Sequence, residues 1–129
     1  MWKALHEGLP VKVKLHSRIP SISPICPRCN EQEETVVHCL WMCPDSKEAW
    51  RLAGLPSLTR EVETWKWWLE FQNSIAGGSN TVEKQELAVN LTWQNWKARN
   101  ELIFEQRRKT PWICLEEARR TASERPRKC

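Results

Sequence analysis

One short window constrains this chain more than any other feature. Residues 26–43, CPRCNEQEETVVHCLWMC, hold four of the six cysteines and one of the three histidines. The spacing C-x2-C-x8-H-x4-C is typical of structural zinc sites, in which three thiolates and one imidazole surround the ion. Such a shell is closed, so it leaves no position for a substrate or a catalytic water. The sequence therefore predicts one structural Zn²⁺ held by Cys26, Cys29, His38 and Cys43.

Cys39 is a rival ligand because it directly follows His38. Neighbours on an α-helix point about 100° apart, so both side chains cannot readily reach one ion. We favour His38, because its helical face also carries Met42 and points toward Cys43. The alternative to a metal site is a buried helix with inert cysteines beside an unrelated C-x-x-C. A redox C-x-x-C is disfavoured, since no βαβ pattern surrounds it.

The N-terminal sequence and the length of the apolar runs indicate the cellular compartment in which we expect the protein. The first ten residues, MWKALHEGLP, contain no unbroken apolar stretch of the secretory kind. No apolar run approaches the roughly 20 residues that a membrane-spanning helix needs. We expect an intracellular protein, in the nucleus or cytoplasm, that is neither secreted nor in a membrane. In a reducing compartment, clustered cysteines are more often metal ligands than disulfides.

The first half of the chain predicts short elements joined by loops. Residues 2–7 read as the end of a helix, and residues 11–19, VKVKLHSRI, alternate in the manner of a strand. A helical turn is the alternative there, because Val11 and Leu15 are also four residues apart. Residues 35–42 predict a short helix, and a second helix should begin at Pro44 and end at Gly54.

The second half predicts longer helices. Residues 61–71, EVETWKWWLEF, should form a helix whose main apolar face carries Val62, Trp65, Trp68 and Leu69, with Trp67 and Phe71 at its side. After the break AGGSN at 76–80, Asn80 is expected to cap a helix over residues 81–108 with one stripe of Val89, Trp93, Trp96 and Ile103. Residues 110–122 predict the last helix, followed by a basic tail.

These elements predict a mainly α fold: a small zinc-knuckle-like module with a Cys-Cys-His-Cys ligand set and a helical C-terminal extension. We divide the chain into a zinc-binding domain at 1–54, a Trp-rich helix with a Gly-rich linker at 55–80, and a helical extension with a basic tail at 81–129.

The sequence contains no recognisable set of catalytic residues. Asp45 is the only aspartate, whereas two-metal nucleases and polymerases need several inward carboxylates. No glycine-rich phosphate loop, G-x-S-x-G elbow or H-E-x-x-H pair is present. We therefore expect a protein that is not an enzyme.

Several segments together resemble the zinc-binding domain of plant LINE-type, non-LTR reverse transcriptases. They are WKALHEGLP at 2–10, CPRC at 26–29, EETVVHCLWMCP at 33–44, KEAW at 47–50 and WQNWKARNELIF at 93–104. The resemblance implies the same four zinc ligands, and Cys39 stands where that family usually has leucine. It also implies a free-standing fragment of a retrotransposon protein, without the polymerase and RNase H domains. The family context suggests an accessory element that binds RNA or single-stranded DNA.

The residues that could contact a nucleic acid are basic or aromatic and lie in or near the knuckle. They are Lys12, Lys14, Arg18, Arg28 and Trp41. Residues 81–129 also carry eleven Lys and Arg against seven Asp and Glu, which is compatible with a polyanion partner or with solvated helix faces.

Two other functions stay open. In the first, the chain is a structural or protein-interaction module, whose Trp93 and Trp96 helix docks on a reverse transcriptase or another protein. In the second, it is a retroelement remnant without a selected function. Salt dependence separates the binding alternatives, because phosphate contacts weaken steeply with salt and apolar docking does not.

Overall fold

The computed structural model describes residues 9–56 and 63–124. These residues form α2 (Lys12–Arg18), the π-helical turn η1 (His38–Met42), α3 (Pro44–Ala53), α4 (Thr64–Ile75), α5 (Thr81–Glu105) and α6 (Pro111–Glu124). Among them no strand forms, and one isolated antiparallel bridge joins Ile25 to Glu33. The predicted mainly α fold is confirmed. The helix expected at 2–7 and the basic tail lie outside the described residues.

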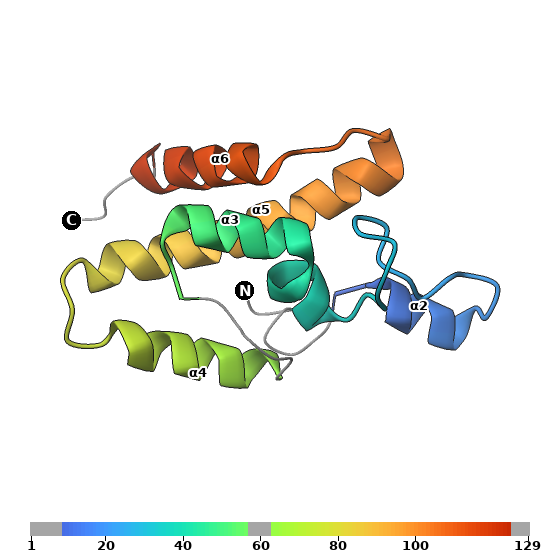
Figure 1. The fold of residues 1–129 in the computed structure, drawn as a ribbon, viewed down its shortest axis with the longest axis horizontal. Helices are drawn as coiled ribbons and strands as arrows, with labels where there is room; N and C mark the ends of the chain where they lie inside the picture. The colour runs from blue at the N-terminus through green and yellow to red at the C-terminus, as the bar shows by residue number, and fades with distance from the viewer. Residues whose placement is uncertain (1–8, 57–62, 125–129) are drawn as a thin grey trace.

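The long helix α5 contacts η1, α3, α4 and α6 (Figure 1). Helix α6 packs along α5 and α3, η1 packs between α3 and α5, and α4 runs along the N-terminal part of α5. Helix α2 and the loop that follows it lie at one end of the molecule. None of the helices in the described ranges is both long and apolar enough to cross a membrane.

A cluster of aromatic rings joins η1, α3 and α4 into one core. The ring centroid of Trp67 lies 4.3 Å from that of Trp41 and 5.3 Å from those of Trp50 and Phe71. Stacked and edge-to-face pairs of this kind add to the stability gained from burial. The indole N–H of Trp50 donates to the Leu40 carbonyl at 3.0 Å, so this buried polar group is satisfied.

The prediction of which face of α4 is buried is wrong for two of its residues. Trp65 and Leu69 are 48% and 53% exposed, whereas Trp67 and Phe71, expected at the side, are buried. Trp68 is partly buried against the core, and Val62 lies outside the described residues. Every position from Trp65 to Leu69 except Lys66 is apolar. Helical spacing alone therefore fits more than one face, and the aromatic rings of η1 and α3 determine which one is buried.

The strand expected over residues 11–19 is also wrong, and the helical alternative is correct. Val11 is buried at the start of α2, and the backbone N–H groups of Lys12 and Val13 donate to the side chain and carbonyl of Glu34, at 2.7 and 3.2 Å. Because Glu34 satisfies these first-turn donors, the segment forms a helix without a partner strand.

Two details of α5 differ from the prediction. Asn80 has a left-handed conformation with φ 60° and makes no side-chain cap, so the predicted capping arrangement is wrong. The helix ends at Glu105 rather than Arg108, because Gln106 is also left-handed with φ 50°.

The predicted stripe on α5 does not face the core as a unit. Trp96 is buried, but Trp93 is 53% exposed. The side of α5 that faces the core includes Ala88, Leu91, Asn95 and Ala98. Trp93 lies about 140° around the helix from Ala88 and about 160° from Asn95, so its ring is on the opposite side.

Contacts cross the predicted division of the chain at residues 54 and 80. Arg99 of α5 forms a buried ion pair with Glu34, and the Asn95 amide donates to the Leu40 carbonyl at 3.1 Å. Buried residues from η1, α3, α4, α5 and α6 belong to one apolar cluster. The boundaries stay a prediction, and the described parts of all three predicted segments contribute to one core.

Candidate metal centre

Cys26 and Cys29 lie in a tight turn of a short hairpin-like loop. The Cys26 N–H donates to the Gln32 carbonyl and the Asn30 N–H to the Cys26 carbonyl, each at 2.8 Å. Asn30 has a φ of 58°, a conformation that asparagine adopts more readily than most residues. The turn between the two cysteines thus directs both thiols to the same side of the loop.

His38 and Cys43 come from the two ends of the π-helical turn. The Cys43 N–H donates to the His38 carbonyl at 2.7 Å, which is the i to i+5 bond of a π-helix. On an α-helix, residues five apart would point about 140° from each other. The wider turn therefore brings these two side chains together. The Thr35 hydroxyl accepts a hydrogen bond from the His38 N–H at 3.0 Å and stabilises the start of this segment.

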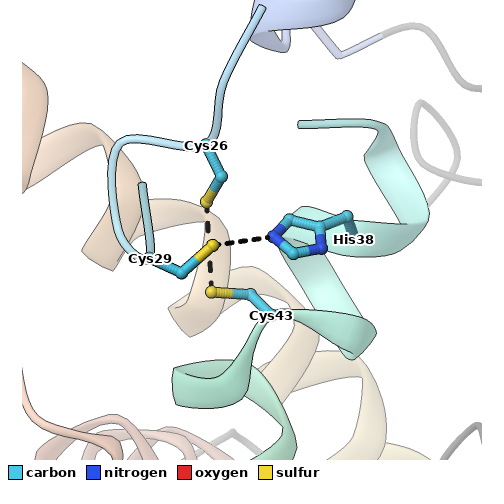
Figure 2. Close-up of side chains that lie close together, drawn as sticks. All are labelled: Cys26, Cys29, His38 and Cys43. Atoms are coloured by element: carbon cyan, nitrogen blue, oxygen red, sulfur yellow. Dashed lines mark hydrogen bonds between the residues drawn. The ribbon is translucent and has the colours of Figure 1, made fainter. Parts of the chain in front are cut away.

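The four predicted ligands converge on one point (Figure 2). Their ligand atoms all lie within 4.8 Å of one another. The sulfur atoms of Cys26 and Cys43 are 3.9 Å apart, and Cys29 Sγ is 3.4 Å from His38 Nε2. Zn–S and Zn–N bonds of about 2.3 and 2.0 Å at a tetrahedral angle give separations of roughly 3.8 Å between two sulfurs and roughly 3.5 Å between a sulfur and a nitrogen. The donor set and its spacing therefore fit a tetrahedral zinc ion.

The thiols and the imidazole shift one another's proton affinities. The hydrogen bond to Cys43 and burial raise the pKa of Cys26 to about 12. The same hydrogen bond lowers the pKa of Cys43, against the effect of burial, and the positive charge of Arg28 adds to the lowering. Burial opposes a charged His38, yet its bonds to Cys26 and Cys29 raise its pKa overall. A metal ion must displace protons from such a site, so its binding weakens as the pH falls.

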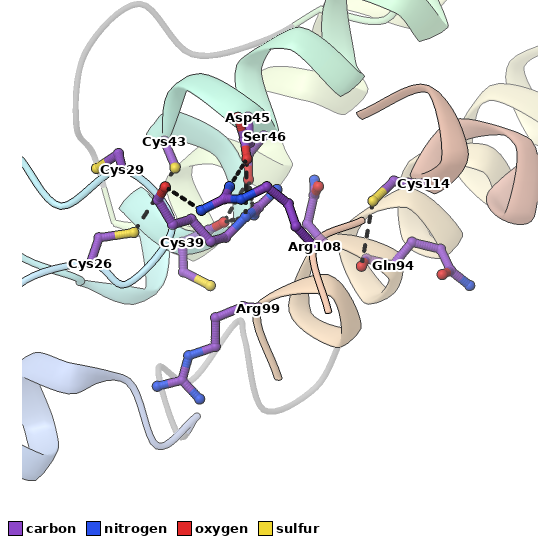
Figure 3. Close-up of polar contacts among 12 residues, drawn as sticks. Cys26, Cys29, Cys39, Cys43, Asp45, Ser46, Gln94, Arg99, Arg108 and Cys114 are labelled. Atoms are coloured by element: carbon purple, nitrogen blue, oxygen red, sulfur yellow. Dashed lines mark hydrogen bonds and ion pairs between the residues drawn. The ribbon is translucent and has the colours of Figure 1, made fainter. Parts of the chain in front are cut away.

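Cys39, the rival ligand, does not join this group. It belongs to the apolar core, is fully buried, and its sulfur points away from those of Cys26 and Cys43 (Figure 3). Burial, and then the charge of Glu34, raise the pKa of its thiol well above the ordinary value. The structure thus brings His38 rather than Cys39 to the candidate metal centre.

Two of the predicted nucleic-acid contacts need correction. Trp41 is fully buried against Trp67, so no base can stack on it. Arg28 is only 6% exposed and donates to buried partners. Lys12, Lys14 and Arg18 differ from these two, because all three lie on α2 and are half-buried or exposed.

Much of the positive charge that follows α5 is paired within the chain. Arg108 forms an ion pair with Asp45 at 3.0 Å, and Lys109 lies 2.7 Å from Glu117 and 3.3 Å from Glu101. The RRK segment at 107–109 therefore contributes less free charge than the sequence suggested.

Sequence reasoning missed three residues that support the centre. Glu34 is a fully buried carboxylate, Asn95 donates to the Leu40 carbonyl of η1, and Arg108 donates to the Arg28 carbonyl at 3.2 Å. No local signal identifies them, because the partners named here are far away in the chain. They lie 63 and 80 positions from Arg108 and 55 positions from Asn95, and Glu34 pairs with Arg99 65 positions away and accepts the Lys12 N–H 22 positions away.

Comparison with known protein families relates the N-terminal part of the chain to one of them. Residues 1–50 match a family model described as zinc-binding in reverse transcriptase. The match covers less than half of the 129 residues, but it contains all four ligands of the candidate centre. No curated protein and no solved structure matches the chain.

Proposed function

We propose that this chain is a non-catalytic zinc-binding module of reverse-transcriptase origin that serves as an accessory nucleic-acid-binding element. The observation that carries the proposal is the convergence of three thiols and one imidazole within 4.8 Å. The match of residues 1–50 to the reverse-transcriptase zinc-binding family supports the choice of metal and the origin. The plant LINE source, a nuclear or cytoplasmic location and the status as a fragment are part of the same proposal.

The role of the zinc is structural in this proposal. Three of the four ligands are buried, and together they complete a tetrahedral shell with no position left for a substrate. Zinc would join the loop of Cys26 and Cys29 to the two ends of η1. Because η1 carries Trp41 into the aromatic core, the metal would also stabilise the packing of α3 and α4.

Zinc content tests this part directly. We expect native mass spectrometry of the full chain to show one zinc per molecule. His38→Ala and Cys43→Ala should lose it, whereas Cys39→Ala, the matched control in the same helix, should keep it. A folded parent without zinc, or loss of zinc only with Cys39→Ala, would refute the assigned shell.

The nucleic-acid surface proposed here is α2. Its sequence KVKLHSR contains Lys12, Lys14 and Arg18 and no carboxylate, and it lies next to the loop that leads to the metal centre. A local excess of about three positive charges would bind phosphates without base specificity and with strong salt dependence. The ligand would be RNA or single-stranded DNA.

The test compares two triple variants in a binding assay with a labelled single-stranded oligonucleotide. One variant combines Lys12→Gln, Lys14→Gln and Arg18→Gln. It should bind more weakly, and the slope of the logarithm of its binding constant against the logarithm of the salt concentration should fall by the amount expected for up to about three phosphate contacts. The control variant makes the same change to glutamine at three exposed basic residues on other helices, which are Lys66, Lys97 and Arg119. Equal losses in both variants would indicate only a general effect of net charge.

One observation favours a second candidate function, a protein-interaction module. Trp93 and Phe104 lie eleven residues apart, three turns along one face of α5, and are 53% and 73% exposed. Trp96 is buried and drops out of this surface. In this alternative the face of Trp93 and Phe104 packs against a polymerase or another protein, and Trp93→Ala would abolish that association at any salt concentration while leaving nucleic-acid binding unchanged.

A further inference from the structure

Arg28 is a charged side chain in an unexpected place. It lies between the two cysteines of the C-P-R-C turn, and its side chain is only 2% exposed. Removing a guanidinium from water costs several kcal/mol unless opposite charge and hydrogen bonds compensate for the lost solvation. The neighbours of Arg28 must therefore account for its burial.

The protein neighbours satisfy only part of this requirement. Nη1 of Arg28 donates to the Ser46 hydroxyl at 2.8 Å and more weakly to the Cys39 carbonyl at 3.4 Å. Nη2 is buried and has no hydrogen-bond partner in the described part of the chain. A buried donor left in this way is costly, which suggests that something else stabilises the cation.

Within residues 9–56 and 63–124, one carboxylate forms an ion pair with Arg28, and it is shared with another arginine. Nε of Arg28 lies 3.9 Å from Asp45 Oδ2, and Nη1 of Arg108 lies 3.0 Å from the same oxygen. Two positive groups and one negative group leave a net charge of +1. Asp45 is closer to Arg108, so most of the uncompensated charge belongs to Arg28.

A loaded Cys-Cys-His-Cys shell carries the missing charge. Three thiolates contribute −3 and zinc contributes +2, so the loaded site has a net charge of −1. Arg28 is adjacent in sequence to Cys29. Its guanidinium donates to the carbonyl of Cys39, the residue after His38, and to the hydroxyl of Ser46, in the first turn of the helix that follows Cys43. The two unbalanced charges are therefore neighbours in the same buried region.

We propose that Arg28 is the buried counter-charge of the metal site, a positioning residue that favours a shell of three thiolates and one imidazole over a neutral shell. This inference rests on the proposed zinc binding. It differs from a purely structural role, in which Arg28 would only hold Ser46 and the Cys39 carbonyl in place.

The first test measures zinc affinity of the full chain by competition with a chromophoric chelator. Changes next to metal ligands commonly reduce affinity about 10- to 100-fold, and we expect a loss in that range for Arg28→Met. Arg28→Lys should retain most of the affinity, because it keeps the charge but not the guanidinium geometry. Equal losses in both variants, or none in either, would overturn the proposal.

The second test varies the charge of the shell. Cys29→His makes the loaded shell neutral, and Cys29 is the ligand that is not fully buried, so the larger imidazole can be accommodated there. His38→Cys makes the loaded shell −2. The factor by which Arg28→Met reduces zinc affinity should be smaller in the Cys29→His background and larger in the His38→Cys background. The same factor in these two backgrounds and in the parent chain would mean that Arg28 acts through packing alone.

A third variant keeps the proposal testable if Arg28→Met fails to fold. Asp45→Asn leaves Arg28 in place and removes the shared negative charge, so zinc affinity should hold or rise. A loss as large as that expected for Arg28→Met would overturn the proposal. The parent chain is measured first: a parent that binds no zinc refutes the proposed function itself, whereas a parent that binds zinc regardless of Arg28 refutes only this inference.

Discussion

The buried ion pair between Glu34 and Arg99 should control the stability of the whole described fold. Arg99 Nε and Nη2 donate to the two oxygens of Glu34 at 3.0 and 2.9 Å, and the two side chains are 3% or less exposed. Glu34 also accepts the Lys12 N–H, and Arg99 donates to the Pro10 carbonyl at 3.2 Å. Removing one partner leaves an uncompensated charge in the core.

We therefore expect Arg99→Met to lower the free energy of unfolding by roughly 3–5 kcal/mol, because Glu34 would be left buried and unpaired. That is a large fraction of the about 5–15 kcal/mol typical of a domain. Replacing both residues, Glu34→Leu with Arg99→Met, should cost much less than the sum of the two single changes. The remaining loss, about 1–3 kcal/mol, would come from the unpaired Lys12 N–H.

The assay is urea denaturation followed by tryptophan fluorescence, at one pH and one saturating zinc concentration for all variants. The cycle of two single variants and the double variant gives the coupling energy directly. A loss below about 1 kcal/mol for Arg99→Met, or additive losses in the double variant, would refute the reasoning. Either result would mean that water reaches Glu34 and that the pair is not buried in solution.

Three further predictions concern the core and the metal. Trp67→Ala should lower the free energy of unfolding by about 3–5 kcal/mol, whereas Trp65→Ala, its exposed neighbour on α4, should change it by less than about 0.5 kcal/mol in the same denaturation assay. Removing zinc with a chelator should lower the melting temperature and shift the emission of Trp41 to longer wavelength, and adding zinc back should reverse both changes. The raised pKa of Cys39 means that the fold favours its neutral thiol, so this contribution to stability is present below the ordinary thiol pKa of about 8.5 and is lost as the pH rises above it. With zinc bound, Cys39→Ala should therefore make stability depend less on pH between about 8 and 10, as measured by urea denaturation at each pH.

The candidate site could be predicted from sequence because its residues lie close together along the chain. All four ligands lie within 18 consecutive residues, and their types and spacing follow from the chemistry of zinc. The choice of His38 over Cys39 agreed with the structure for a different reason from the one we gave. An α-helix was assumed, and the observed π-helical turn is what places His38 over Cys43.

The buried faces of the helices could not be predicted, because they depend on partners far away in the chain. α4 is apolar around much of its circumference, so only its partners Trp41 and Trp50 determine that Trp67 is buried. α5 presents a mixed pattern in which Trp93 is exposed and Arg99 is buried, the opposite of what hydropathy alone predicts. Such inversions occur where a specific ion pair or small-residue contact outweighs the general preference of a side chain.

These long-range contacts bear on how far the matched region can act by itself. Glu34 lies within residues 1–50, yet its charge is balanced by Arg99. The Leu40 carbonyl of η1 accepts hydrogen bonds from both Trp50 and Asn95, and Trp41 stacks on Trp67. A zinc ion can fix four side chains in space, but it cannot supply a counter-charge for Glu34 or a cover for Trp41. The helices that follow residue 50 must therefore supply both the counter-charge for Glu34 and the cover for Trp41. For this reason we expect the smallest part of the chain that folds around zinc to extend at least through Arg99.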